Sequence, residues 1–292
     1  MGSNKEKRKL QISNGHYLLF DELAKLMNAI VSLSDQKKIL MSDLEEASGL
    51  PFRQVRNRIS IGRAMGLFLS KTLDLSAVGC LIAKYDMFFG NKGTLEWLHY
   101  KASSSYVNLV WFETFNTFLP HHSPQNYEEW LSYFRGTLAE NYTEHSLKDH
   151  LGKEVRFLID AYTSSGFSKL QLLYEASDGR ISRRRYARPC EEVLAAMIYT
   201  FGANQGATLL QVAELVEQPA SPGLLLAMDQ GTLLQLLESL NGRGWLRLET
   251  THNLAQVRLL DGYDPLAFLE AFYEKRKPVP TKKKTKEERM LL

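Results

Sequence analysis

Hydrophobic side chains recur with helical spacing near the start of the chain. From Phe20 to Leu33 they fall at i, i+3, i+4, i+7 and i+8, the positions of Leu23, Leu26, Met27, Ile30 and Val31. This spacing places them on one face of an amphipathic helix. A second helix is expected to begin at Ser42, because Ser42 and Glu45 have the spacing of a capping box.

A glycine turn and a basic helix follow. Gly49 is expected to end the second helix, and Pro51 suits the first turn of a third helix that runs to about Gly66. A short helix, a tight turn and a longer basic helix form the order of a helix-turn-helix. We therefore assign residues 15–75 to a helix-turn-helix domain and residues 1–14 to a mobile basic arm.

The central part of the chain, residues 76–168, carries many aromatic side chains at three- and four-residue spacings. This pattern is typical of a packed helical core. Four helical stretches are expected within it: Thr94–Lys101, Val107–Phe118, Tyr127–Asn141 and Leu147–Tyr162.

Residues 169–274 read differently. The turn dipeptide Asp178-Gly179 between short apolar segments favours a small β-hairpin. Three helices are expected next, followed by two strands of alternating polarity and a closing helix: Glu191–Phe201, Leu209–Val216 with Thr208 as its N-cap, Gly231–Leu240, residues 245–249, residues 254–260 and Pro265–Arg276. Three helices and a terminal hairpin form the order of a winged helix. The lysine-rich residues 275–292 are expected to be a disordered basic tail.

The predicted fold class is therefore mainly α. It combines an N-terminal helix-turn-helix, a central aromatic-rich helical core and a C-terminal winged-helix-like unit with a small β-hairpin.

The composition is that of an ordinary globular protein, with 44% hydrophobic and 24% charged residues among 292. No apolar run approaches the roughly 18 residues that a membrane span needs, and no apolar segment follows the charged start as in a secretory signal. Cys80 and Cys190 are too few for a disulfide framework and are expected to be buried thiols. These features predict a cytoplasmic protein.

The net charge is only +3, but the positive residues are unevenly distributed. They gather in four places: Lys5 to Lys9, Arg53 to Arg63, Arg180 to Arg188, and Lys275 to Arg289. Because phosphate attraction acts within a Debye length, such clusters matter more than the total charge.

The third helix carries the side chains best suited to DNA. Arginine pairs with guanine, and asparagine or glutamine with adenine, in the major groove. The candidate contacts are Arg53, Gln54, Arg56, Asn57, Arg58 and Arg63. The alternative is a solvated basic face that meets acidic side chains of another subunit.

Two further basic groups are candidates for contact with the DNA backbone. The first is the patch formed by Arg180, Arg183, Arg184, Arg185 and Arg188, for which the alternative is a solvated loop. The second lies in the winged unit, with Arg243, Arg247 and the wing-tip residues Thr251, His252 and Asn253. The third helix of that unit has no basic residue, so a role in protein interaction stays open.

Catalytic signals are sparse. Asp86, Glu96 and His99 are candidates for chemistry, although a histidine among aromatics is more typical of a hydrogen-bonded core residue. The chain has neither a His-Glu-x-x-His motif nor a glycine-rich phosphate loop. A nicking endonuclease would need Mg²⁺ or Mn²⁺, and the sequence permits that chemistry without indicating its ligands.

Several segments together resemble a known bacterial family. They are Ile82–Phe89, Gly93–Tyr100, Leu109–Asn116, Gly15-His16, the helix-turn-helix, and Ser221-Pro-Gly223 with its leucine-rich helix. The family is encoded beside sulfur-transfer genes in DNA phosphorothioation defence clusters, and its best-known kind is the DNA-nicking subunit of the Ssp phosphorothioation system. The likeness covers about residues 14–273.

The family usually has an acidic and a hydroxyl residue directly after the Gly-His pair, where this chain has Tyr17 and Leu18. The resemblance implies a DNA-targeting role in modification or defence, with sulfur-transfer and ATPase subunits as partners, and it transfers no catalytic residue to this chain.

The leading hypothesis is thus a DNA-binding component that positions duplex DNA, and the sequence leaves open whether it also nicks it. The alternatives are a homodimeric transcriptional regulator without catalysis and a winged-helix scaffold that docks other proteins.

Overall fold

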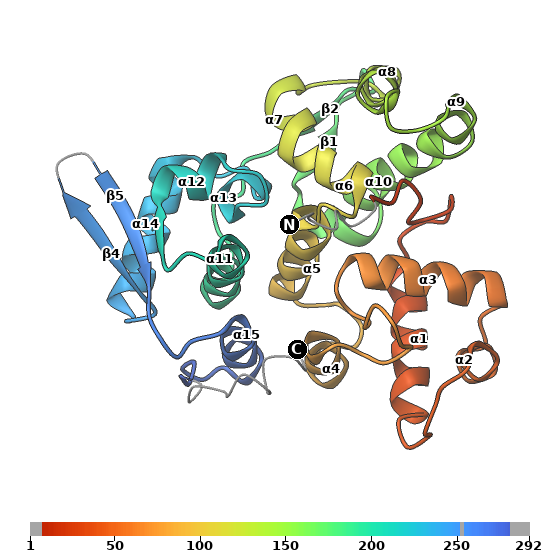
Figure 1. Cartoon of the computed structure of the whole chain (residues 1–292), viewed down its shortest axis with the longest axis horizontal. Helices are drawn as coiled ribbons and strands as arrows, with labels where there is room; N and C mark the ends of the chain where they lie inside the picture. The colour runs from red at the N-terminus through yellow and green to blue at the C-terminus, as the bar shows by residue number, and fades with distance from the viewer. Residues whose placement is uncertain (1–7, 252–253, 281–292) are drawn as a thin grey trace, which may run out of the picture.

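The computed structural model describes residues 8–251 and 254–280 and is mainly helical, with two small antiparallel sheets. The first three helices are α1 (Phe20–Ser32), α2 (Met41–Ser48) and α3 (Phe52–Ala64), close to their predicted positions (Figure 1). Gly49 ends α2 with a φ of +67°, as its sequence position predicted.

The predicted cap of α2 is wrong. The backbone N–H of Leu40 donates to the carboxylate of Asp43 at 2.8 Å, so the helix begins at Met41 and Ser42 does not cap it. Glu45 instead accepts a hydrogen bond from the backbone N–H of Phe52 at 3.0 Å. The side chain expected to cap α2 therefore helps to begin α3.

The expectation of a mobile arm is wrong for residues 8–14. Lys9 is bonded through its backbone to Val107 and Leu109, with N···O distances of 2.8 and 3.2 Å. Leu10 and Ile12 are buried. This segment is therefore built into the body of the protein, because its alternate apolar side chains have a core to enter.

The central region holds helices and irregular turns that surround α5. They are α4 (Ala77–Tyr85), α5 (Lys92–Ser104), α6 (Leu109–Glu113), α7 (Leu119–His122), α8 (Tyr127–Leu138), α9 (Glu144–Ser146) and α10 (Gly152–Thr163), with π-helical turns at Thr114–Phe118 and Leu147–Leu151 and a 3₁₀ turn at Gly166–Leu170. Helix α5 is buried on nearly every side and contacts α6, α11 and α13. The aromatic spacing thus predicted a packed core correctly, whereas α4 and the π-helical turns were not expected.

The small hairpin predicted around Asp178-Gly179 is present. Strands β1 (Leu173–Glu175) and β2 (Ile181–Arg183) pair in antiparallel fashion, and Gly179 turns between them with a φ of +76°.

The C-terminal unit holds four helices and a three-stranded antiparallel sheet. These elements are α11 (Glu191–Gln205), β3 (Leu209–Gln211), α12 (Val212–Glu217), α13 (Pro222–Leu225), α14 (Gln230–Gly242), β4 (Leu246–Thr251) and β5 (Leu254–Leu259), with sheet order β3-β5-β4. The helix predicted over Leu209–Val216 is wrong in its first turn, since Leu210 lies opposite Val257 of β5 and both are buried. Gln211, not Thr208, is the residue before α12.

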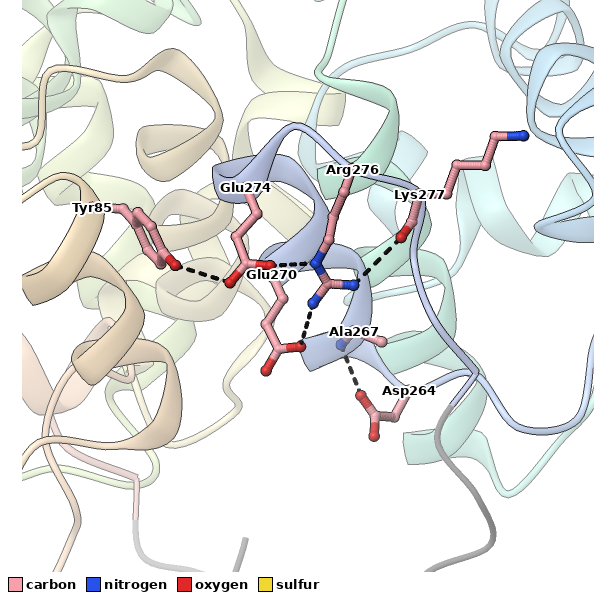
Figure 2. Close-up of polar contacts among 7 residues, drawn as sticks. All are labelled: Tyr85, Asp264, Ala267, Glu270, Glu274, Arg276 and Lys277. Atoms are coloured by element: carbon pink, nitrogen blue, oxygen red, sulfur yellow. Dashed lines mark hydrogen bonds and ion pairs between the residues drawn. The ribbon is translucent and has the colours of Figure 1, made fainter.

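Helix α15 (Pro265–Glu274) lies between α11 and α4 and joins the C-terminal unit to the rest of the chain (Figure 1). Figure 2 shows its polar ends: the hydroxyl of Tyr85 donates to Glu274 at 2.9 Å, and Arg276 pairs with Glu270 and Glu274. The ring of Tyr85 also stacks on the ring of Tyr273, with the two ring centroids 5.7 Å apart. The closing helix is therefore an interface between distant parts of the sequence.

The structure also bears on two predictions made from the composition, which concern membrane-spanning segments and the two cysteines. Within residues 8–251 and 254–280, no helix has the length and apolar character that crossing a membrane requires. Cys80 is exposed and Cys190 is half-buried, so the expectation of two buried thiols is wrong for Cys80.

Candidate nucleic-acid interface

Helix α3 sorts its polar residues onto two faces. Arg53 and Arg56 are exposed, and Gln54 is half-buried. Asn57 and Arg58 are buried, because they lie on the side of α3 that turns toward the protein interior. Only part of the predicted basic set therefore reaches solvent.

Arg58 is a structural residue, and its predicted contact with DNA is overturned by its burial. Its side chain is 2% exposed, its Nε lies 2.7 Å from the carboxylate of Glu22, and its Nη1 donates to the carbonyl oxygen of Tyr17 at 2.5 Å. The guanidinium thus connects α3 to α1 and to the segment that precedes α1.

Arg63, near the end of α3, is half-buried. Its guanidinium donates to the carbonyl oxygens of Leu69 at 3.0 Å and Thr72 at 2.7 Å. These bonds hold the loop after α3 and fix the direction of the side chain. Arg63 also lines a cleft beside the helix.

This cleft, which we call the α3 cleft, has a volume of about 700 Å³. Most of its lining is uncharged: Ile12, Met41, Ile59, Ser60, Ala64, Ser70, Leu73, Ser105, Val107 and Asn108. Three cationic residues, Lys9, Arg56 and Arg63, complete it, and among the described residues no acidic one does. Such a lining favours an anionic ligand.

Two smaller hollows continue along the N-terminal segment. The first hollow, of about 540 Å³, shares the lining residue Lys9 with the α3 cleft. The second hollow, of about 220 Å³, shares Gln11 and His150 with the first hollow. Lys153 also lines the smallest hollow. Positive residues therefore follow the N-terminal segment away from α3.

Glu154 also lines the smallest hollow, and its carboxylate accepts hydrogen bonds from the N-terminal segment. It accepts the backbone N–H groups of Ser13 and Asn14 at 3.0 Å and the Ser13 hydroxyl at 2.9 Å. Burial raises the pKa of Glu154, and these hydrogen bonds oppose the rise. The amide of Asn14 in turn donates to Asn57 at 3.0 Å, so Gly15-His16 lies beside α3.

Asn14, Ser60 and Asn108 were missed by sequence reasoning, and Lys9 was noted only as part of the basic cluster Lys5 to Lys9. Ser60 lies one turn after Arg56 on the same face of α3, so helical periodicity could have identified it. Lys9, Asn14 and Asn108 are placed by contacts between distant segments, for which the sequence carries no local signal.

The second basic patch is divided by the fold. The guanidinium of Arg183 is inserted against α13, where it donates to the carbonyl oxygens of Leu224 and Leu225, and burial lowers its pKa to about 10. The predicted backbone contact of Arg183 is therefore contradicted by its position.

The other four arginines of this patch are exposed. Arg185 pairs with Asp229 at 2.9 Å, Arg180 lies 3.8 Å from Asp178, and Arg184 lies over the ring of Tyr174. Arg188 completes the group, which surrounds the hairpin β1–β2 and the segment after it.

The two arginine candidates of the C-terminal unit differ in their contacts. Arg243 pairs with Glu191 at 2.6 Å and lies over the ring of Trp245, whereas Arg247 is exposed on β4. His252 and Asn253 at the predicted wing tip lie outside the described residues, as does the side chain of Thr251.

The catalytic candidates are not brought together. Asp86 accepts the backbone N–H groups of Gly90 at 2.8 Å and Asn91 at 3.0 Å, and thereby shapes a loop. Glu96 is fully buried and accepts from the Tyr186 hydroxyl at 2.6 Å and the Cys190 backbone at 2.9 Å. Both carboxylates therefore have structural partners.

His99 is a core histidine. It is fully buried, its Nδ1 lies 2.5 Å from the Tyr162 hydroxyl, and its Nε2 lies 3.1 Å from the carbonyl oxygen of Leu225. Burial lowers the pKa of His99 to about 3. In residues 8–251 and 254–280, no group of three or more histidine, cysteine, aspartate or glutamate side chains is arranged to hold a metal ion.

Comparison with known proteins identifies both a family and a fold. The model of a family described as "Protein of unknown function (DUF4007)" matches residues 64–273. Two crystal structures of SspB are similar to the chain, with TM-scores of 0.73 and 0.75, 14% identity, and coverage of 90% of this chain and 87% of theirs. No curated protein matches the sequence.

The SspB likeness confirms, at the level of the fold, the resemblance inferred from the motifs. One of the two structures is described as magnesium ion-bound.

Proposed function

Since the chain belongs to the DUF4007 family and has the fold of SspB, we propose that it is a duplex-DNA-binding component of a DNA phosphorothioation modification or defence system. The observation that carries the proposal is the exposed pair Arg53 and Arg56 on α3, beside a cleft whose described lining has three cations and no carboxylate. The motif likeness to phosphorothioation proteins and the shared SspB fold support the assignment to that system.

The binding surface is the exposed face of α3 together with the N-terminal segment. Arg53 and Gln54 are the residues available to base edges, and Lys9, Arg56 and Lys153 are available to phosphates. Asn57 and Arg58 support the surface from below. In this proposal α2 and α3, joined at Gly49, act as the two helices of the predicted helix-turn-helix.

The C-terminal unit has a different part in the proposal. It is the unit predicted to be a winged helix and it contains the β3-β5-β4 sheet, but α14 carries no basic residue. A helix of that composition is poorly suited to phosphate contact. We assign this unit to the docking of partner proteins, for which the sulfur-transfer and ATPase subunits of such a system are the candidates.

Binding of a 30-base-pair duplex, followed by fluorescence anisotropy between 50 and 200 mM salt, tests the proposal. Affinity is expected to fall steeply with salt, because bound cations release condensed counterions. The double variant Arg53→Glu/Arg56→Glu is expected to bind at least about tenfold more weakly, with a salt slope reduced by about two.

The matched control is Lys25→Glu/Lys38→Glu, which makes the same change in charge at exposed residues outside α3 and the lining of the α3 cleft. Its affinity is expected to stay near the wild-type value. Equal losses in both double variants, or no binding at low salt, would contradict the proposal.

Two further measurements separate this proposal from its alternatives. Co-purification with sulfur-transfer and ATPase subunits is expected for a component of the system and not for a lone regulator. Conversion of supercoiled plasmid to open circles in Mg²⁺ or Mn²⁺, and its loss with chelator, measures whether nicking accompanies binding.

A further inference from the structure

The α3 cleft has a volume of about 700 Å³ and is lined by three cationic residues. We propose that it binds a single phosphate-bearing nucleotide, with the phosphate held by Lys9, Arg56 and Arg63. The inference deepens the proposed function and rests on it, because a protein that handles DNA strands meets such a nucleotide in a strand or free beside it.

The charge of the cleft points to an anion. Within the described residues, none of the three cations takes part in an ion pair, although the neighbouring Arg8 and Arg58 pair with Glu113 and Glu22. Cations that line one cleft without a carboxylate repel one another, and a bound phosphate lessens that repulsion. Arginine offers the fork of donors that phosphate oxygens accept.

Two parts of the cleft, the backbone at Lys9 and the side chain of Arg63, are held in place before any ligand arrives. The backbone of Lys9 is bonded on both sides to the segment 107–109, and the guanidinium of Arg63 is fixed by two carbonyl oxygens. Preorganised side chains lose little conformational freedom on binding. The cleft is therefore suited to a defined ligand and not only to a diffuse counterion cloud.

The size and the remaining lining point to a nucleotide. At about 700 Å³ the cleft exceeds the space that a bare phosphate fills and lies within the range of small-molecule sites, about 300–1,000 Å³. Its partly exposed apolar residues, among them Met41, Leu73 and Val107, offer surface to a base or sugar.

Polar side chains in the lining can meet the edges of that ligand. Ser60, Ser70 and Ser105 supply hydroxyls. The amide nitrogen of Asn108 donates to the carbonyl oxygens of Ala64 and Ala102, both at 2.9 Å, which sets the direction of its amide oxygen. A few fixed polar groups in a largely apolar lining are typical of ligand-binding sites.

Isothermal titration calorimetry on the full chain tests the inference with deoxyadenosine monophosphate, deoxyadenosine and inorganic phosphate as probes. The monophosphate is expected to bind at least about tenfold more tightly than either of the others, because only it engages both the cations and the apolar lining. Equal affinity for all three probes, or no binding of the monophosphate, would overturn the inference.

Two variants locate the site. Ser60→Phe fills the cleft without removing a charge, and Lys9→Ala removes one cation without filling it. Both are expected to weaken binding of the monophosphate at least about tenfold, while Lys25→Ala leaves it unchanged. Lys9→Ala carries the test alone if Ser60→Phe fails to fold, and unchanged binding in Lys9→Ala then overturns the inference.

A 5′-phosphorylated single-stranded trinucleotide distinguishes the two sources of the nucleotide. Tighter binding of the trinucleotide than of the monophosphate indicates a DNA strand, and equal or weaker binding indicates a free nucleotide; either supports the site if Lys9→Ala weakens it. If duplex affinity is normal and neither probe binds, this inference fails alone. If the monophosphate binds and the duplex does not, the proposed function fails and the site remains.

Discussion

Arg58 and Glu22 form an ion pair between α3 and α1, with the Arg58 Nε and a Glu22 carboxylate oxygen 2.7 Å apart and the arginine 2% exposed. Arg56, two residues earlier, is exposed and takes part in no ion pair within the described residues. One short helix therefore carries arginines with opposite tasks: Arg58 holds the fold, and Arg56 is free for a ligand.

Replacing these two arginines separates stability from binding. Arg58→Met leaves Glu22 without its partner and is expected to lower the free energy of unfolding by about 3 kcal/mol, since one partner of a buried pair is lost. Arg56→Ala is expected to change it by less than about 0.5 kcal/mol while weakening the binding of DNA. Urea unfolding and duplex titration measure the two effects; similar stability of both variants would contradict the assignment of Arg58.

The hydrogen bonds of Glu154 hold the N-terminal segment against α10. Glu154→Gln keeps the shape but removes one acceptor oxygen and the charge, so we expect a loss of about 1–2 kcal/mol and faster amide exchange at Ser13 and Asn14. Hydrogen exchange read by mass spectrometry measures the local effect. Glu140→Gln, at an exposed position, is the control. Equal amide protection of Ser13 and Asn14 in both variants would contradict the role of Glu154 in holding the N-terminal segment.

The buried His99 predicts a dependence of stability on pH. Its pKa is lowered from 6.5 to about 3 by burial, so between these values the unfolded chain takes up a proton that the folded chain refuses. The stabilisation is fully present above about pH 6.5 and is lost as pH falls, with a slope of up to about 1.4 kcal/mol per unit.

His99→Gln is expected to be less stable at pH 7 and to lack this part of the slope. His145→Gln, whose side chain is 85% exposed in the parent, is the control and should retain it. Chemical unfolding at pH 5, 6 and 7 measures the slopes, and an unchanged slope in His99→Gln would show that another group is responsible.

Gly223, in the Ser221-Pro-Gly223 motif, is required by a close approach of backbones. A Cβ at this position would lie 2.4 Å from the carbonyl oxygen of Leu215 and 3.1 Å from the Cα of Val216. Gly223→Ala must therefore separate α13 from α12, and we expect a loss of about 1–3 kcal/mol.

Gly136 in α8 offers a matched control, because a Cβ there meets nothing within 4 Å. Gly136→Ala is expected to stabilise the protein by about 0.5–1 kcal/mol through helix propensity. Thermal unfolding compares the two variants, and a Gly223→Ala protein as stable as Gly136→Ala would be inconsistent with the packing.

Helices with an apolar stripe could be predicted from local spacing. Helix α1 was predicted to within one residue at its end, and the aromatic spacing of the centre indicated the core that contains Trp111 and Phe115. The strand at Leu209–Gln211 could not be found in this way, because it exists through pairing with β5, whose residues lie about 45 positions later.

The candidate site divides in the same manner. Helical periodicity places Arg53, Arg56 and Ser60 near one another on α3, and the basic composition of this helix is visible in the sequence alone. That Arg58 is buried follows from its position one turn after the buried Val55, and this signal was available in the sequence. Lys9 was assigned to an arm because its neighbours are charged, yet its backbone pairs with residues about 100 positions away.

By itself, then, the sequence determined the helices, the basic character of α3 and the family likeness, because these depend on spacing and composition along a short stretch of chain. Only the tertiary structure decided which charges are free. The partner of Arg58, and the burial and partners of Arg183 and Glu154, depend on segments that folding brings together. The α3 cleft exists because the N-terminal segment, α3 and the link between α5 and α6 meet there, leaving three cations without a carboxylate among the described lining residues.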